Sequence, residues 1–209
     1  MSLEKRAATM PLTADGQTIG GYAAVFNSPT DIGGMWNEVI APGAFTESLR
    51  SGQDVLALYS HEVDRLLGRR SSGTLRLTED ARGLGVEIDL PDTSDGRDVG
   101  VLVKRGDLKG MSFGFVVTKQ EWDETVEPPR RTIYQVDLRE VTVTASPAYE
   151  DTEIGMRSLC TFRDTRKAEA IAARQAKHAH IDQRRAGKRE ILNKLAPENT
   201  SSGSNEPRQ

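Results

Sequence analysis

The sequence predicts a mainly β fold with a few short helices, in which about seven strands form a closed or nearly closed antiparallel barrel. Three observations lead to this fold class. Segments in which apolar and polar residues alternate recur along the chain, as half-buried strands require. Turn-forming residues separate these segments, and 19 of the 209 residues are glycine. Helical patterns do not follow every strand, so a parallel α/β sheet fits the chain poorly.

Three strands and one helix are expected in the first part of the chain. Turn clusters at 27–29 and 42–43 end the first two strands. After the second turn, apolar residues four apart predict a short helix over 44–50, with Gly52 at its C-cap. The three strands are expected over residues 20–26, 36–40 and 55–59.

A hairpin, a helix and two further strands are expected in the second part. The alternating segments 74–78 and 84–90 are expected to pair across a polar turn. Ser94 can cap a helix whose apolar positions follow helical spacing, and Gly106 would end it. The two further strands are expected over 112–118 and 132–143, joined by a polar loop.

The charge distribution divides the chain near residue 160. Residues 161–209 contain eleven lysines and arginines and six acidic residues, whereas the whole chain carries a net charge of −3. We therefore expect an acidic β-barrel domain over 1–160 and a basic tail over 161–209. The tail is rich in helix formers but poor in apolar residues, so it should be weakly helical to disordered, with 199–205 disordered.

Composition narrows the possible functions. No apolar run approaches the roughly 20 residues that span a bilayer, and the first residues lead into no apolar signal segment, so we expect synthesis in the cytoplasm. The single cysteine, Cys160, cannot form an internal disulfide or a cysteine-rich zinc site, and no cofactor or metal is expected. An acidic body makes a nucleic-acid partner a poor fit, because phosphate contacts need a basic face.

Two side chains in the body could supply nucleophilic chemistry. His178 and His180 lie in the tail, so His61 is the one histidine of the body; it follows a strand and begins a polar loop that runs to Arg69. Ser112 lies between glycines in the segment LKGMSFGF, where a substrate backbone could approach closely. Each residue also has a structural interpretation, in which His61 is a surface histidine and Ser112 fills a small site of the sheet.

A third candidate comes from the period of the last strand. If Val136 and Leu138 face inward, Glu140 faces inward with them and Asp137 faces outward. A buried carboxylate needs a charged or donating partner, which could be an imidazolium or an arginine such as Arg69 or Arg139. A bulge would change this assignment. Ser112, His61 and Glu140 together could form a nucleophile, a general base and an orienting acid.

Five ordered motifs carry a resemblance to a known family. The chain resembles the prohead (head maturation) proteases of tailed bacteriophages over roughly residues 15–157, and that family is similar to the herpesvirus assemblins, serine proteases with a seven-stranded β-barrel surrounded by helices. The motifs are GYAAVFNSP, EVIAPGAFTESL, LALYSHEVDRLLGR, LKGMSFGF and VDLREVTVTASPAYEDT.

The resemblance implies specific roles for residues of this chain. It makes Ser112 the nucleophile, His61 the base and Glu140 the acid, with Asp137 as the rival acid. Assemblins use a second histidine as the third member, and the body of this chain has none to spare. The donors of an oxyanion hole stay open between backbone N–H groups of glycine-rich turns and the pair Arg69-Arg70.

The resemblance also implies a substrate and a place of action. The expected activity is cleavage of the scaffold or delta segment of the major capsid protein, and of the protease itself, inside the immature procapsid in the bacterial host cytoplasm. A homodimer or higher oligomer is possible. The competing hypothesis is a non-catalytic capsid assembly or scaffold protein that retains the protease fold.

Overall fold

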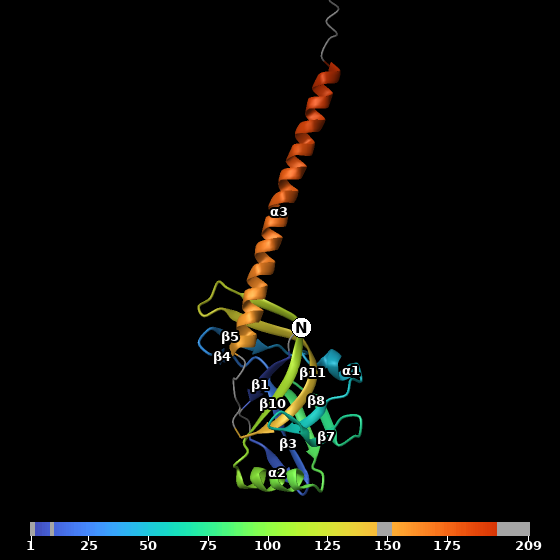
Figure 1. The fold of residues 1–209 in the computed structure, drawn as a ribbon, viewed down its shortest axis with the longest axis vertical. Coiled ribbons are helices and arrows are strands. Elements are labelled where there is room, and N and C mark those ends of the chain that lie inside the picture. Colours follow the sequence, from blue (N-terminus) through green and yellow to red (C-terminus); the bar gives the residue numbers. More distant parts are fainter. Residues whose placement is uncertain (1–2, 9–10, 146–151, 196–209) are drawn as a thin grey trace, which may run out of the picture. The chain divides into compact units, whose positions relative to one another are not determined.

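A computed structural model describes residues 3–8, 11–145 and 152–195, and it is mainly β with three helices in the part described (Figure 1). The chain forms two compact units, Met1–Arg157 and Ser158–Gln209. No helix within the described ranges has an apolar stretch long enough to cross a bilayer.

The strands of the first unit pair in two sheets. The strand order in the larger sheet is β1, β10, β11, β5 and β4. Strand β6 pairs with β11 as well, and β7 pairs with β6. In the smaller sheet the order is β2, β3, β9 and β8. The larger sheet contains β1 (Glu4–Ala8), β4 (Thr30–Ile32), β5 (Trp36–Ile40), β6 (Leu56–Tyr59), β7 (Glu62–Arg69), β10 (Gly110–Asp123) and β11 (Arg130–Thr144). The smaller contains β2 (Thr13–Asp15), β3 (Thr18–Val25), β8 (Leu75–Glu79) and β9 (Gly83–Asp89).

The sheet topology corrects the expected antiparallel barrel. Among the described strands no ladder joins the two sheets, so they do not close into one barrel. Strand β11 also runs parallel to both β5 and β6. The chain passes from β5 through the short helix α1 (Thr46–Arg50) to β6, and both strands lie along one edge of the long strand β11. Alternation of apolar residues identifies strands but not their partners, so it could not reveal this crossover.

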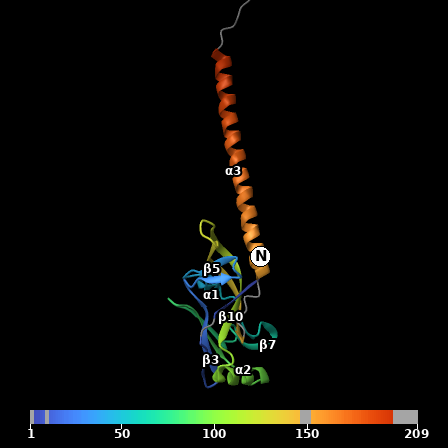
Figure 2. The ribbon, with the colours of Figure 1, turned by 90° about the vertical axis from the view of Figure 1, so that its left-hand side faces the viewer.

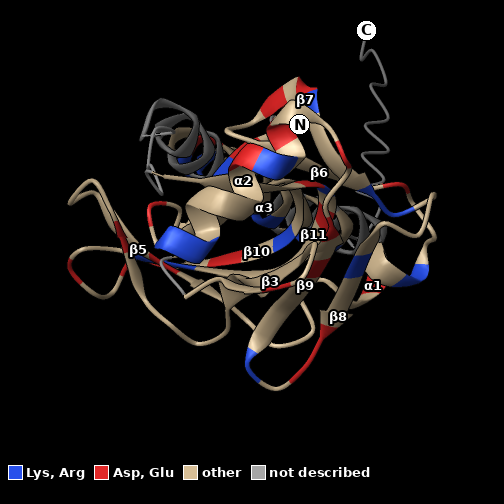
Figure 3. Ribbon diagram, turned by 90° about the horizontal axis from the view of Figure 1, so that it is seen from below, with Lys and Arg blue, Asp and Glu red and all other residues tan. Residues whose placement is uncertain are grey.

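Most expected elements are present, with three local corrections, the first being that the C-cap of α1 is Ser51 rather than Gly52. The hairpin of β8 and β9 forms as expected. Helix α2 (Ser94–Arg105) ends at Gly106, whose φ of 79° suits glycine, but its N-cap is Thr93, whose side chain accepts from the Gly96 N–H. Asp95 lies in its first turn and basic residues lie in its last (Figure 3), in accord with the helix dipole. The expected polar loop after His61 is instead strand β7.

One face of strand β10 packs into the hydrophobic core, and the other faces away from the core. Phe113 and Phe115 are buried in the core, and their rings stack with centroids 4.8 Å apart. Phe45, just before α1, packs edge-on against Phe113 at 5.5 Å. Because side chains alternate along a strand, Ser112 and Gly114 lie on the opposite face of β10 from these rings.

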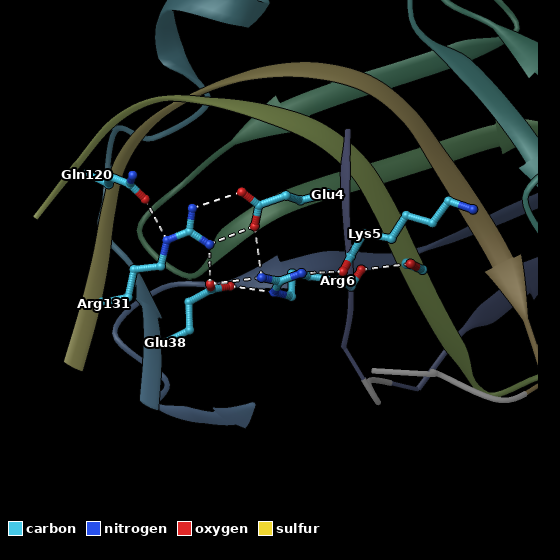
Figure 4. A network of polar contacts seen from close by, with 7 residues as sticks. Glu4, Lys5, Arg6, Glu38, Gln120 and Arg131 are labelled. Atoms are coloured by element: carbon cyan, nitrogen blue, oxygen red, sulfur yellow. Dashed lines mark hydrogen bonds and ion pairs between the residues drawn. The ribbon is translucent and has the colours of Figure 1, made fainter. Parts of the chain in front are cut away.

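A buried ionic network anchors the N-terminal strand β1 (Figure 4). The Arg131 guanidinium donates to Glu4 at 2.6 and 2.8 Å, to Glu38 at 2.9 Å and to Gln120 at 2.6 Å. Arg6 donates to Glu38 at 2.6 and 3.0 Å and to Glu4 at 2.9 Å. Burial raises the pKa of Glu38, but the guanidiniums of Arg6 and Arg131 outweigh burial and hold that pKa below its usual value.

The described residues of the second unit belong to one unbroken helix, α3 (Thr152–Leu195), which Figure 2 draws in orange to red. Ile171, one of its few apolar residues, is 50% exposed. Cys160, on the same helix, is exposed and free. The segment 199–205, expected to be disordered, lies outside the described residues.

Candidate active site

Strands β10 and β11 place four residues of the site on one face of the larger sheet. In their antiparallel register, Ser112 is opposite Thr142 and Gly114 is opposite Glu140. All four residues are buried. Phe113 and its neighbours occupy the other face, toward the core. Directly opposed residues on one face of an antiparallel pair have Cβ atoms roughly 4.5–5.5 Å apart. The register therefore makes Ser112 a near neighbour of Thr142.

A β-bulge corrects the expected orientation of Glu140. Phe115 is opposite Leu138 and Gly114 is opposite Glu140, so Arg139 is an extra residue without a partner in β10. The bulge reverses the alternation, because Leu138 and Val141, three apart, both lie in the core. Glu140 is buried as expected, but it faces away from the core residues that were expected to surround it.

His61 is presented by a two-residue turn between β6 and β7. Tyr59 pairs with Glu62 across this turn, and Ser60 and His61 have φ values of 53° and 62°. Positive φ at both central residues matches a type I′ hairpin turn, which usually contains Asn-Gly. The Ser60 N–H donates to the Val143 carbonyl at 3.0 Å, which fixes the turn to β11. A left-handed serine and histidine therefore occupy positions that favour glycine, as strained residues at functional sites often do.

Replacing Ser60 by glycine is expected to stabilise the protein by about 0.5–1 kcal/mol. Relief of a left-handed L-residue is worth about 1–2 kcal/mol, and the backbone entropy that glycine loses on folding offsets roughly 0.5–1 kcal/mol of this. The measurement is the free energy of unfolding in urea. Ser60→Ala is the matched control, because alanine keeps the strain and should bring no gain. Equal stability of the glycine and alanine variants would contradict the strain argument.

His61 and Glu140 form a close pair at the centre of the site. The Nδ1 atom of His61 lies 2.6 Å from Oε1 of Glu140, and the two side chains are 20% and 9% exposed. The other carboxylate oxygen, Oε2, accepts from the Thr142 hydroxyl at 2.6 Å. With a proton on Nδ1 pointing at the carboxylate, the ring presents Nε2 as the acceptor, the tautomer that a general base needs.

Ser112 lies on the same face of the larger sheet as Glu140, but no hydrogen bond joins it to His61 in the described structure. Its hydroxyl donates to the Arg6 carbonyl at 2.8 Å, and the residue is 1% exposed. The contact arises because β1 pairs with β10, with Ala7 opposite Ser112. The sheet therefore brings His61 and Glu140 into contact. It places Ser112 on the same face as Glu140, with the Ser112 hydroxyl turned toward β1.

The alternative partners of Glu140 are engaged elsewhere. Arg69 pairs with Asp54 at 3.2 Å, and Arg139 donates to Asp137 at 2.5 Å. The hypothesis of a structural pair between Glu140 and either arginine is therefore wrong. Asp137, the rival acid, lies beyond the bulge and is bound to Arg139, so the hydrogen bond to His61 favours Glu140.

The arginines considered as oxyanion donors are also occupied. The Arg70 guanidinium donates to the carbonyls of Leu49 and Gln53, and Arg69 is held by Asp54 as described. Backbone N–H groups thus stay as the candidate donors.

Two residues of the site were not recognised from the sequence. From the sequence, Thr142 is one residue of the expected strand 132–143 without a role of its own, and Gly114 is one of the glycines that leave room for a substrate. The signal that could have identified Thr142 is its spacing of two from Glu140, which puts both side chains on one face. Gly114 could not be identified without the register that sets it opposite Glu140.

Comparisons with known proteins identify the family of this chain. Residues 2–168 match the family described as caudovirus prohead serine protease. The chain is 34% identical over 164 residues to a prohead protease of Enterobacteria phage HK97, a match that covers 75% of this chain and 68% of that protein. No solved structure matches the chain. The protein is thus a serine peptidase with a role in phage head maturation. The chain belongs to the caudovirus prohead serine protease family.

Proposed function

We propose that this chain is an endopeptidase in which Ser112 is the nucleophile, His61 the general base and Glu140 the orienting acid. The observation that carries the proposal is the 2.6 Å contact between His61 Nδ1 and Glu140 Oε1, on the face of the sheet that also carries Ser112. A serine hydroxyl is a weak nucleophile unless a base accepts its proton, and the carboxylate stabilises the imidazolium that forms.

The proposed reaction follows from these positions. The Ser112 hydroxyl turns about χ1 from the Arg6 carbonyl toward Nε2 of His61, a change between staggered rotamers. Its oxygen then attacks the peptide carbonyl carbon while His61 takes the proton. Collapse of the intermediate breaks the C–N bond, and His61 returns the proton to the leaving amine. Water, activated by the same imidazole, releases the acyl group and restores the hydroxyl.

The proposed substrates are the scaffold or delta segment of the major capsid protein and the protease itself, cut inside the immature procapsid in the host cytoplasm. Family membership supports a capsid-related substrate, and the name of the HK97 relative places that protein at the prohead. The tail from residue 160 onward, in the second unit, is the proposed region of self-cleavage. A homodimer or higher oligomer is proposed as the active form.

Covalent labelling tests the proposed nucleophile. Diisopropyl fluorophosphate should modify Ser112 of the folded protein, because only an activated serine displaces fluoride at a useful rate. Peptide mass mapping locates the label. The control is His61→Gln, which keeps a polar side chain but removes the base and should slow labelling strongly. The proposal fails if another serine takes the label, or if wild type and His61→Gln react at the same rate.

The competing hypothesis, a non-catalytic assembly protein, conflicts with membership of a serine peptidase family, and it makes the opposite prediction. In that case the folded protein takes no label at Ser112, and a co-expressed capsid precursor stays intact. Labelling at Ser112 together with cleavage of the precursor would exclude it.

A further inference from the structure

We infer that Thr142 and Gly114 are positioning residues that set the Glu140 carboxylate against His61. The inference rests on the proposed function, because it assigns them a role only through the His61–Glu140 pair. Neither residue touches a reacting atom in the proposed reaction, so each would act on the rate through the orientation of the imidazole.

Thr142 fixes the rotation of the carboxylate. Glu140 has its Oε1 on His61 and its Oε2 on the Thr142 hydroxyl, each at 2.6 Å. The terminal torsion of a glutamate is broad and prefers no single orientation. A carboxylate held at one oxygen alone could swing about that contact, whereas hydrogen bonds at both oxygens fix its plane. Thr142 is 0% exposed, so water cannot readily replace its hydroxyl.

Gly114 provides the space in which the carboxylate lies. A Cβ atom built on Gly114 would lie 2.7 Å from Oε1 and 2.8 Å from Cγ of Glu140, much closer than normal carbon contacts allow. Its φ is not in the left-handed range, so the strand backbone at this position would accept any residue. The need for glycine at 114 therefore comes from the carboxylate opposite, not from the backbone.

The two residues act on opposite sides of one group. Thr142 holds the oxygen farther from His61, and the absent side chain of Gly114 leaves room for the oxygen nearer to it. Loss of either feature should let the carboxylate move from Nδ1, and the ring would then lose both its fixed tautomer and its orientation. A displacement of about 1 Å at a catalytic group can cost 10²-fold in rate.

The test compares substitutions that differ only in their effect on Glu140. Thr142→Val removes the hydroxyl at nearly constant volume, and Thr142→Ser keeps it. Thr132→Val is the matched control, the same change at a half-buried position of the same strand. For Gly114→Ala the control is Gly20→Ala in β3, where the nearest atom to the new Cβ would lie at 3.4 Å.

Kinetics on a purified capsid precursor should separate these variants. Thr142→Val and Gly114→Ala are expected to lower kcat by about 10²-fold with KM little changed, and Thr142→Ser should restore most of kcat. Both controls should match wild type. If Thr142→Val and Thr132→Val have equal kcat, the inference is overturned.

A spectroscopic measurement tests the inference apart from activity. In the Ser112→Ala background, ¹H NMR of ¹⁵N-histidine-labelled protein should show a strongly deshielded His61 Nδ1 proton, assigned by its loss in His61→Gln. The signal should persist with Thr142→Ser and disappear or move upfield with Thr142→Val and Gly114→Ala. If the signal is unchanged in both Thr142→Val and Gly114→Ala, the positioning role is overturned. If Ser112→Ala still cleaves the precursor, the proposed nucleophile is wrong. The NMR signal would still report whether Thr142 and Gly114 position Glu140.

Discussion

A chain with alanine at position 112 is expected to cleave a capsid precursor about a million-fold more slowly than wild type, as in other serine peptidases that lose the nucleophile. The alanine variant should still fold, because the hydroxyl makes a single hydrogen bond, to the Arg6 carbonyl, worth about 1 kcal/mol. Cleavage in purified mixtures with wild type or variant, followed by gel electrophoresis and mass spectrometry, measures the loss.

The control for this experiment is Ser94→Ala. Ser94 is exposed at the start of α2 and is not the cap of that helix, so its loss should not affect cleavage. Equal processing of the precursor by wild type and Ser112→Ala would remove Ser112 from the mechanism. A matching loss in both serine variants would point to a disturbed fold rather than a missing nucleophile.

Replacing Arg131 by methionine is expected to cost about 3–5 kcal/mol of stability, the loss typical when one partner of a buried ion pair is removed. Arg131 is 0% exposed and donates to both Glu4 and Glu38, and two arginines and two glutamates make the network neutral. Without Arg131, two buried carboxylates would share one guanidinium. The free energy of unfolding in urea measures the effect.

Arg130→Met is the matched control for this substitution. Arg130 is the next residue of β11, but its side chain is 52% exposed and pairs with Asp123 at the surface, a contact worth at most about 1 kcal/mol. Replacing all four ionic residues of the network by apolar residues of similar size should recover much of the stability. Similar destabilisation by Arg130→Met and Arg131→Met would contradict the claim that the network anchors β1.

Local pattern predicted which segments become strands, but not how the strands pair. The alternation at 36–40 and the turn signals around the hairpin of β8 and β9 are local, and the structure confirms both. The parallel pairing of β11 with β5 and β6 depends on contacts between segments far apart in the chain, which no local pattern encodes. Strand β1 was not expected, because the charged residues at positions 4 and 6 look exposed until their partners are known.

The sequence supplied the candidate residues of the site but not their geometry. His61 and Glu140 meet as the sequence interpretation required, although period-two alternation alone would have given Glu140 the wrong neighbours. The bulge at Arg139 corrects this, and bulges leave no clear mark in a single sequence. The left-handed turn at 60–61 could not be predicted from the sequence either, because it contains neither asparagine nor glycine.

The order of pairing in the larger sheet has a consequence for the growing chain. Strand β1 is made first, yet its partner β10 begins a hundred residues later, and β10 in turn needs β11, which ends at Thr144. Ladders of such long range form slowly and late. A ribosome-bound fragment that stops short of β11 contains Ser112 and His61 but lacks Glu140 and the strand that joins β10 to β6. Hydrolytic capability should therefore arise only once the body has been synthesised in full, which would protect the host's own proteins from partly made copies.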